Sequence, residues 1–321
     1  MRVIITGGTG FLGARVADLL GARGDTVATF DRRPPGDQNA SRRDASDRSE
    51  THAVYIGDIV DPAALDAAIA QVQPDAIVHL AALLTPECAA SPALGTRVNC
   101  VGTATVFELA GRRGVPRVVF GSSVAALDPA PSGHQGDDRP LRPGSVYGAT
   151  KAYGELLAEA LRQTTGQDLV GLRFGWVYGP GRVRGWNALQ EMIEGFAAEE
   201  PEVRYPDYSG AFDWTHVDDA AAAVVAAIEA PRPARTAYNV TGDRRTVGQA
   251  VRYLRQRFPA VEAVPMAATL PRSAWGFVSD GFGSATGFNA SIRLEDGLER
   301  TVQAIRAAHG LRPDPDSYGG K

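Results

Sequence analysis

The stretch that decides the fold lies at the amino terminus and reads Val3-Ile4-Ile5-Thr6-Gly7-Gly8-Thr9-Gly10-Phe11-Leu12-Gly13. Its apolar start predicts a buried strand, its glycines predict a tight turn, and the residues that follow predict a helix. A turn without Cβ atoms lets the backbone approach a pyrophosphate, which then accepts hydrogen bonds from the N–H groups at the helix start. The stretch therefore predicts a dinucleotide site, with Gly7, Gly10, Phe11, Leu12 and Gly13 as contacts.

An acidic residue stands at the end of the next predicted strand. Asp31 follows an apolar run at residues 27–30 and lies 18 residues after Gly13, near the spacing at which a carboxylate meets the ribose of a bound dinucleotide. A carboxylate there accepts hydrogen bonds from both ribose hydroxyls and repels a 2′-phosphate, so the pattern predicts NAD rather than NADP. Arg32 and Arg33 follow directly, and they leave the strictness of this preference open.

The first half of the chain alternates short apolar strands with longer helical patterns. We expect strands at residues 3–6, 27–30, 54–57, 76–80 and 117–121, and helices at residues 11–23, 63–71, 96–113 and 146–162. Such alternation predicts an α/β fold with a doubly wound, Rossmann-type parallel sheet. The alternation then becomes irregular, which predicts a smaller, interleaved C-terminal substrate-binding part. The expected division assigns residues 1–173 and 212–242 to the NAD-binding domain, and residues 174–211 and 243–321 to the substrate-binding part.

The composition excludes several functions. The 321 residues include 33 basic and 37 acidic side chains, for a formal charge of −4, which lacks the basic balance of a nucleic-acid binder. No apolar run reaches the ~18 residues of a membrane span, and Met1 leads directly into the first strand, so we expect no membrane segment and a cytoplasmic location. Cys88 and Cys100 are expected to be free thiols. The five histidines show no metal-ligand spacing, so no metal is expected.

Two residues one helical turn apart carry the predicted chemistry. Tyr147 and Lys151 lie in the expected helix at residues 146–162, and a spacing of four places them on one face. A phenol with a pKa of about 10 is a weak base, but a nearby ammonium favours its anion. The phenol can then take a proton from a substrate alcohol as hydride leaves for the cofactor, or return it. The chain has 31 Arg and only two Lys, of which Lys151 is the internal one.

Four further polar residues each have two interpretations. Ser122 and Ser123 end the strand that leads to the helix, where one hydroxyl can hold the substrate oxygen, or both can be strand-end caps. Asp58, after the third strand, either reaches the adenine or caps a loop. Asn99 either positions the active-site helix or forms an ordinary buried amide hydrogen bond.

In the order of its motifs the chain resembles the extended short-chain dehydrogenase/reductase family, in its NAD-dependent epimerase/dehydratase group. The matching pieces run almost from end to end of the chain. They are residues 6–13, Gly57-Asp58, residues 79–82, Asn99 with Gly102-Thr103, Ser122-Ser123, and residues 147–151, 172–181, 216–219 and 294–298.

The resemblance implies a seven-stranded parallel sheet that binds NAD. It implies Tyr147 as the acid/base, Lys151 as a ligand of the nicotinamide ribose that lowers the tyrosine pKa, and Ser123 rather than Ser122 as the catalytic hydroxyl. It also implies a homodimer, in which the helices at residues 96–113 and 146–162 pair into a four-helix bundle. The further cofactor contacts it implies are Asp58, Ile59, Leu80, Ala81, Ala82, Asn99, Ser122, Tyr147 and Lys151.

Four positions depart from the family pattern and bear on the substrate. Val124 and Ala125 stand where the family's dehydratases carry a pair of acids, so proton transfer there is impossible and a 4,6-dehydratase is not expected. Trp176 and Phe212 stand where nucleotide-sugar epimerases carry Asn and Arg that contact the diphosphate. Since neither aromatic side chain neutralises a pyrophosphate, a nucleotide-sugar substrate is disfavoured.

The remaining candidates are substrate contacts, namely Thr85, Ser123, Trp176, Arg182 and Arg184. The two arginines suit a small anionic or carbohydrate-like substrate, although they are equally compatible with ordinary surface residues. We therefore expect an NAD-dependent oxidoreductase that transfers hydride at a secondary alcohol or ketone of a small polar substrate. The alternatives are an NAD-dependent nucleotide-sugar 4-epimerase and a non-catalytic dinucleotide-sensing regulator, which would have no use for the Tyr–Lys–Ser set.

Overall fold

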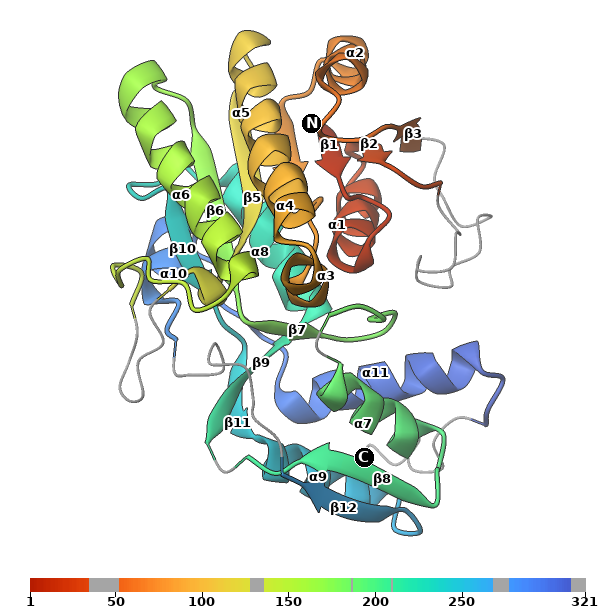
Figure 1. Ribbon diagram of the computed structural model, residues 1–321. Coiled ribbons are helices and arrows are strands. Elements are labelled where there is room, and N and C mark those ends of the chain that lie inside the picture. Colours follow the sequence, from red (N-terminus) through yellow and green to blue (C-terminus); the bar gives the residue numbers. More distant parts are fainter. Residues whose placement is uncertain (35–51, 128–135, 186, 209, 268–276, 313–321) are drawn as a thin grey trace.

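A seven-stranded parallel sheet forms the centre of the molecule (Figure 1). The computed structural model describes residues 1–34, 52–127, 136–185, 187–208, 210–267 and 277–312. The strands of the sheet lie in the order β10-β6-β5-β4-β1-β2-β3, and each pairs in parallel with its neighbours. They are β1 (Arg2–Thr6), β2 (Thr26–Asp31), β3 (His52–Ile56), β4 (Ala76–His79), β5 (Arg117–Ser123), β6 (Leu169–Phe174) and β10 (Ala237–Val240). The predicted Rossmann-type fold is confirmed.

Helices cover both faces of this sheet, as near-continuous apolar strands require. On one face lie α1 (Phe11–Ala22) and α8 (Val217–Glu229), and on the other lie α2 (Pro62–Val72), α5 (Gly102–Arg112) and α6 (Val146–Thr165). The alternation of side chains along β1 decides which core each residue joins. Val3 and Ile5 pack in the core of α1 and α8, whereas Ile4 packs in the core of α2 and α5.

The long helix expected at residues 96–113 is divided in the structure. α4 (Pro92–Thr96) runs into a π-helical segment, Arg97–Val101, and α5 continues from Gly102. A π turn inserts one residue into the helical hydrogen-bond ladder and is often found at functional sites. Asn99 lies in this segment and is buried, so the local change of geometry falls on a predicted site residue.

The helix that carries Tyr147 and Lys151 begins where the sequence predicts. Ser145 caps α6, because its hydroxyl accepts a hydrogen bond of 3.0 Å from the backbone N–H of Gly148. Gly148 also permits a close approach, since a Cβ there would lie 2.1 Å from the carbonyl oxygen of Ala125. This contact sets the first turn of α6 against the carboxyl end of β5.

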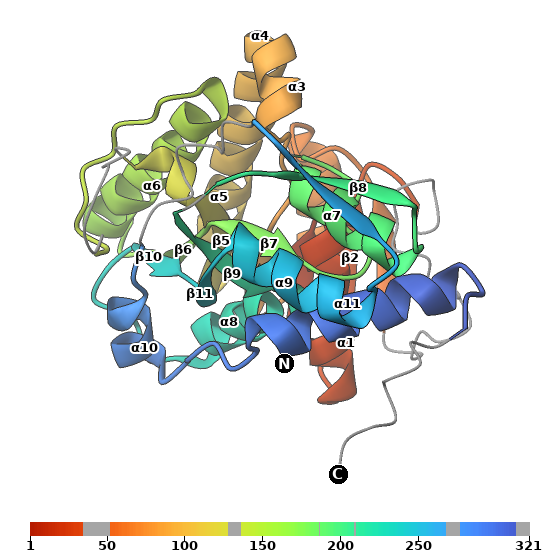
Figure 2. The same cartoon turned by 90° about the horizontal axis from the view of Figure 1, so that it is seen from below.

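A second, smaller part lies beyond the carboxyl ends of the central strands (Figures 1 and 2). It holds a three-stranded sheet in the order β11-β9-β7, a two-stranded sheet of β12 and β8, and a core of its own that includes Trp214. Its elements are β7 (Trp176–Tyr178), α7 (Ala188–Ala197), β8 (Glu202–Pro206), β9 (Ala211–His216), β11 (Asp243–Thr246), α9 (Val247–Arg257), β12 (Glu262–Met266) and α11 (Leu294–Ala308).

Along the described residues the chain enters this smaller part three times, because α8 with β10, and later α10, return to the central domain. β9 contains the predicted boundary at residue 212, and it pairs with β7 and β11 rather than with the central sheet. The division into two parts stays a prediction. Two short helices, α3 (Thr85–Ala90) and α10 (Asp280–Thr286), lie against the central domain. Within the described ranges, no helix has both the length and the apolarity needed to cross a membrane.

Candidate active site

A cavity of about 550 Å³ opens at the carboxyl ends of the central strands. It extends from the glycine turn after β1, across the ends of β2, β4 and β5, to β7 and β9 of the smaller part. The strand order reverses between β1 and β4, which is the usual place for a ligand in this architecture. All predicted site residues except Asn99 line the cavity, namely Gly7, Gly10, Phe11, Leu12, Gly13, Asp31, Asp58, Ile59, Leu80, Ala81, Ala82, Thr85, Ser122, Ser123, Tyr147, Lys151, Trp176, Arg182 and Arg184.

The glycine turn has the shape that a pyrophosphate cradle requires. Gly7 has a φ of 73°, and a Cβ there would lie 2.7 Å from the backbone nitrogen of Ala81. A Cβ on Gly13 would lie 2.2 Å from the carbonyl oxygen of Gly7. α1 begins after Gly10, which has no capping side chain, and its first turn carries no acidic residue. The first N–H groups of α1 are therefore available to an anion, so the turn fits the pyrophosphate of NAD.

The acidic residue after β2 faces the glycine turn. The carboxylate of Asp31 accepts hydrogen bonds from the hydroxyl of Thr9 at 2.6 Å and from its backbone N–H at 3.3 Å. Thr9 thus orients the carboxylate at the edge of the cavity, where the adenosine ribose of NAD would lie. Asp58 also borders the cavity, and its carboxylate accepts a hydrogen bond of 3.2 Å from the backbone N–H of Val60. Both interpretations of Asp58 are compatible with this placement.

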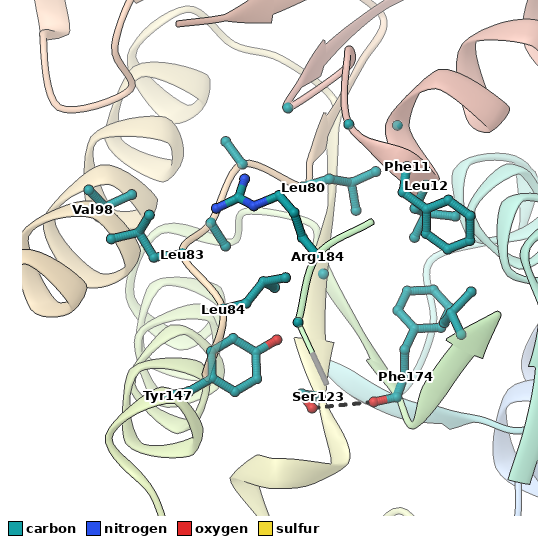
Figure 3. Close-up of a pocket in the computed structure, with 18 of the residues that line it drawn as sticks. Phe11, Leu12, Leu80, Leu83, Leu84, Val98, Ser123, Tyr147, Phe174 and Arg184 are labelled. Carbon is teal, nitrogen blue, oxygen red and sulfur yellow. Dashed lines mark hydrogen bonds between the residues drawn. The ribbon is translucent and has the colours of Figure 1, made fainter. Parts of the chain in front are cut away.

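Tyr147 and Lys151 face the cavity from α6, and Figure 3 shows the tyrosine on the opposite side from Phe11. The ammonium of Lys151 lies 5.6 Å from the centre of the phenol ring and donates a hydrogen bond of 2.7 Å to the carbonyl oxygen of Gly121. Burial raises the pKa of Tyr147 to about 12, although a hydrogen bond with Ser123 and the charge of Arg182 act in the opposite direction. Burial lowers the pKa of Lys151 to about 8.

The two serines at the end of β5 have different surroundings. Figure 3 shows Ser123 between Tyr147 and Phe174, with its hydroxyl donating a hydrogen bond of 3.3 Å to the carbonyl oxygen of Phe174. The same hydroxyl accepts a hydrogen bond from the backbone N–H of Ala125, so it is a strand-end cap that also faces the phenol. Ser122 instead donates to the carboxylate of the buried Glu155. The arrangement favours Ser123 over Ser122 as the hydroxyl that meets a substrate.

Behind Ser122, Glu155 belongs to a buried ion pair. Its carboxylate accepts hydrogen bonds from the guanidinium of Arg173, the shortest at 2.7 Å, and both side chains are almost fully buried. A buried charge is tolerated when it is paired and hydrogen-bonded in this way. The pair joins α6 to β6, and through Glu155 it also anchors the hydroxyl of Ser122.

Asn99 is the predicted contact that does not line the cavity. Its side-chain oxygen accepts a hydrogen bond of 2.8 Å from the backbone N–H of Leu83, and its amide nitrogen donates to the carbonyl of Leu83 and to the hydroxyl of Thr150, each at 3.0 Å. The amide therefore joins the loop after β4 to the first turns of α6. This geometry matches a positioning role and also explains why the amide is buried.

Two aromatic side chains of the smaller part, Trp176 and Phe212, line the cavity, and further rings pack behind them. Trp176 on β7 stacks on Tyr178 at 5.4 Å between ring centres, and it lies 5.7 Å from Phe212 and 5.3 Å from Trp214 on β9. Trp176 and Phe212 are the positions at which the sequence departs from the pattern for a nucleotide sugar. In the structure they form one hydrophobic wall, which has no cation for a diphosphate at these two positions.

The two arginines after β7 differ in their surroundings. The guanidinium of Arg182 lies 5.5 Å from the centre of the Trp176 ring and donates a hydrogen bond of 2.7 Å to the carbonyl oxygen of Val177. Burial lowers the pKa of Arg182 to about 10, and its charge acts on Tyr147. Arg184 lines the cavity and pairs with Glu87 of α3, and both side chains are partly exposed. Arg182 is the better placed of the two to meet a substrate beside the phenol.

Two polar side chains that line the described part of the cavity, Thr9 and Asp213, were missed from the sequence. Thr9 orients Asp31, and its place within the glycine turn gave the only signal. Asp213 is a buried carboxylate in β9 that lines the cavity. A charged residue between two aromatic residues, Phe212 and Trp214, was the signal that pointed to it. Within the described ranges, no three side chains form a group that suits a metal ion.

Together, the glycine turn, the acidic residue after β2 and the Tyr147–Lys151 pair define a dinucleotide-dependent enzyme of the Rossmann class. The model of the NAD dependent epimerase/dehydratase family matches residues 3–241. The chain belongs to this family, and NAD is the cofactor on which the family depends. It is accordingly an NAD-dependent enzyme of the short-chain dehydrogenase/reductase type.

Similar proteins within the family perform different reactions. A UDP-glucose 4-epimerase of Mycolicibacterium smegmatis is 31% identical over 231 residues, which cover 71% of this chain and 73% of that protein. A D-erythronate dehydrogenase of Cupriavidus necator is 38% identical over 163 residues, which cover 49% of each protein. The structure of a Thermus thermophilus UDP-glucose 4-epimerase in complex with NAD has a TM-score of 0.80 at 25% identity, covering 96% of this chain and all of that one.

Proposed function

We propose that this protein is an NAD-dependent dehydrogenase that acts on a secondary alcohol or ketone of a small polar or carbohydrate-like substrate. The observation that carries the proposal is the packing of Trp176 against Phe212 at the substrate end of the cavity. Two aromatic rings replace the polar and cationic groups that a nucleotide diphosphate needs, while the catalytic set of Ser123, Tyr147 and Lys151 is complete. The D-erythronate dehydrogenase relative supports a small substrate.

In the proposed reaction Ser123 and Tyr147 hold the oxygen of the substrate alcohol. The phenolate of Tyr147 takes the hydroxyl proton during oxidation, and the phenol returns it during reduction. When bound, NAD supplies the acceptor or donor of hydride. Because burial favours the neutral phenol, nearby positive charges must offset burial for the phenolate to form. Arg182 acts in this direction, and we assign the same effect to Lys151, which also binds the nicotinamide ribose.

The first alternative is a nucleotide-sugar 4-epimerase, which the Mycolicibacterium relative supports. Such an enzyme oxidises its substrate and then returns the hydride to the other face, so no NADH is released.

The experiment that separates the two activities follows NADH. Purified protein is incubated with NAD and with panels of free sugar acids, hydroxy amino acids and nucleotide sugars, and the NADH formed is measured by absorbance. NADH that accumulates only with a small substrate is the expected result. Epimerised nucleotide sugar without net NADH would overturn the proposal.

The second alternative is a sensor that binds NAD and performs no reaction. It predicts tight NAD binding and no turnover with any member of the panels. The complete catalytic set lining the cavity is the observation that disfavours it. The same incubation separates the two, since a sensor yields neither NADH nor epimerised product.

We also propose that the protein is a homodimer built on α4, α5 and α6. Large apolar side chains are exposed on and between these helices, namely Leu94, Val101, Tyr153 and Leu156, with Leu156 at 61% of its surface. Large apolar side chains that are exposed together on neighbouring helices are typical of an interface between subunits. The expected cytoplasmic location stays a prediction.

A further inference from the structure

Trp176 contacts a charged side chain as well as the other rings of the smaller part. The guanidinium carbon of Arg182 lies over its indole ring, 5.5 Å from the ring centre. This distance is that of a cation–π contact, and tryptophan is the ring that makes the strongest such contact. The ring is fixed in place, because it is only 8% exposed and packs against Tyr178, Phe212 and Trp214. A rigid ring therefore supports a long cationic side chain in the lining of the cavity.

Two further contacts place the guanidinium of Arg182 near the phenol of Tyr147. Its Nη1 donates a hydrogen bond of 2.7 Å to the carbonyl oxygen of Val177. A Cβ on Gly185 would lie 3.3 Å from Nη2 of the guanidinium and 3.3 Å from Cδ1 of Leu84, so the guanidinium and Leu84 are close neighbours. Figure 3 shows Leu84 on the same side of the cavity as Tyr147. The charge of Arg182 accordingly opposes the rise that burial causes in the pKa of Tyr147.

The other titratable groups near the phenol do not supply the same charge at every pH. Lys151 lies 5.6 Å from the ring centre, but burial lowers its pKa to about 8, so its charge is lost above that value. Burial raises the pKa of the Cys88 thiol on α3, which is therefore neutral. The other charged residues that the described part of the smaller domain adds to the cavity are Asp213 and Arg184, which is paired with Glu87. Burial lowers the pKa of Arg182 only to about 10, so its charge persists where the lysine is neutral.

We propose that Trp176 is a positioning residue for the reaction, because its ring holds the guanidinium of Arg182 near the phenol of Tyr147, where the charge stabilises the phenolate. The inference rests on the proposed function in that Tyr147 is taken as the acid/base. Trp176 stands where nucleotide-sugar epimerases carry Asn, so this departure from the family pattern has a second effect besides disfavouring a diphosphate. It couples proton transfer on α6 of the central domain to a side chain of the smaller part.

The test titrates the phenol itself and needs no turnover. Tyr147 is replaced by difluorotyrosine in the full chain saturated with NAD, because ring fluorines lower the pKa of a phenol enough to titrate it while the protein stays folded. Fluorine NMR then follows this one group. Arg182→Gln should raise the measured pKa by about one unit, which is about a tenfold loss of phenolate at a given pH, as expected when a neighbouring opposite charge is removed. Trp176→Leu should raise it by a similar amount, and Trp176→Phe by less than half as much.

A double-mutant cycle distinguishes positioning from a change in the burial of the phenol. In the Arg182→Gln background, Trp176→Leu should cause no further rise, because the ring then has no guanidinium to hold. Trp176→Met serves if the leucine variant does not fold. Arg184→Gln is the matched control, since it removes the same charge from the same cavity but from a partly exposed pair with Glu87. It should leave the measured pKa unchanged.

Three results would overturn the inference. They are a phenol pKa that neither Arg182→Gln nor Trp176→Leu raises, a rise with Trp176→Leu that is absent or is equal with and without Arg182, and a rise with Arg184→Gln as large as that with Arg182→Gln. None of these results depends on NADH. The predicted pattern supports the inference even if no substrate panel yields NADH, whereas the lack of NADH counts against the dehydrogenase alone.

Discussion

The ammonium of Lys151 lies 5.6 Å from the centre of the Tyr147 ring, one turn away on the same helix, and it donates a hydrogen bond to the carbonyl oxygen of Gly121. The bond to β5 holds the lysine side chain between the strand end and the phenol. Because burial lowers the pKa of Lys151 to about 8, the side chain is charged below that pH and loses its charge above it. The geometry therefore suits a phenol that exchanges a proton while the ammonium beside it stabilises its anion.

Lys151→Arg should lose most activity while the protein stays folded. Arginine keeps the charge, but its planar guanidinium presents different donors to a ribose. The arginine side chain is also longer than the lysine side chain, whose ammonium reaches the carbonyl oxygen of Gly121. We expect kcat/KM to fall about 100-fold or more, the size of effect typical of acid–base catalysis. Steady-state kinetics with a substrate that the NADH incubation identifies measures the loss, and an unchanged Tm establishes that folding is intact. Turnover near the wild-type rate would contradict the role assigned to the lysine.

Asp31→Asn should weaken the preference for NAD over NADP. The amide keeps a contact with Thr9 but removes the negative charge that repels a 2′-phosphate. With Arg32 and Arg33 bordering the cavity beside it, the ratio of the dissociation constants for NADP and NAD should drop ~10-fold or more. Fluorescence titration of the two reduced cofactors checks this. An unaltered ratio would mean that Asp31 does not meet the ribose.

The two arginines after β7 should contribute unequally. Arg182→Ala removes a partly buried guanidinium beside Trp176 and Tyr147 and should raise KM by ~10-fold or more. Arg184→Ala breaks only a partly exposed pair with Glu87, and such pairs contribute roughly 0–1 kcal/mol. Its effect on KM should stay within a few fold. Equal losses in the two variants would refute the assignment of Arg182 as the substrate contact.

At alkaline pH the Asp213→Asn variant, without bound ligand, should be more stable toward unfolding than the wild-type protein. In the folded chain burial keeps Asp213 protonated up to a pKa of about 7, whereas in the unfolded chain the proton leaves at about 3.8. Between these values the folded state binds more protons than the unfolded state, so stability from this group falls as pH rises. The amide does not titrate, and the variant should gain on the order of 2–4 kcal/mol at pH ~8 and less at pH ~5.

Urea denaturation of wild type and variant at the two pH values measures this difference. Asp66→Asn provides the comparison, since Arg113 lowers the pKa of that surface carboxyl. Its replacement should not stabilise the chain at either pH. A gain for the Asp213 variant that is the same at both pH values would show that the buried carboxyl titrates normally.

Leu156→Glu should convert the proposed dimer into a monomer. Leu156 is the most exposed of the apolar residues on α4 to α6, and a charge at the centre of a helix-bundle interface would be left unpaired when buried. Sedimentation velocity should give a dimer for wild type and a monomer for the variant. Val54→Glu, at an exposed apolar position on the edge strand β3, should remain dimeric. A monomeric wild-type protein would refute the proposed interface.

Much of the fold could be predicted from the sequence because the signals are local. Short apolar runs gave the first five strands to within two residues at each end, and the glycine turn predicted the start of α1 at Phe11. The π-helical segment at Arg97–Val101 could not be predicted, since its hydrogen-bond pattern differs from that of an α-helix without a change in hydrophobic periodicity. The pairing of β9 with β7 and β11 depends on contacts between distant parts of the chain, which no local pattern records.

The cofactor end of the site followed from the sequence more completely than the substrate end. Glycines and an acid at this spacing predict a dinucleotide site when a strand precedes them and a helix follows. By contrast, Trp176, Phe212 and Asp213 come from two separate strands, and only their packing shows that the rings form a wall while the carboxylate turns away from it. The surroundings of Arg182 likewise depend on the fold of the smaller part.

The central claim is that hydride leaves the substrate and is released as NADH. The most direct measurement uses a substrate deuterated at its carbinol carbon, with product and cofactor examined by mass spectrometry after incubation with NAD. The account predicts deuterium in free reduced cofactor and none at that carbon of the ketone product. Deuterium retained at the same carbon of an inverted alcohol, with no reduced cofactor released, would contradict it and identify the protein as an epimerase.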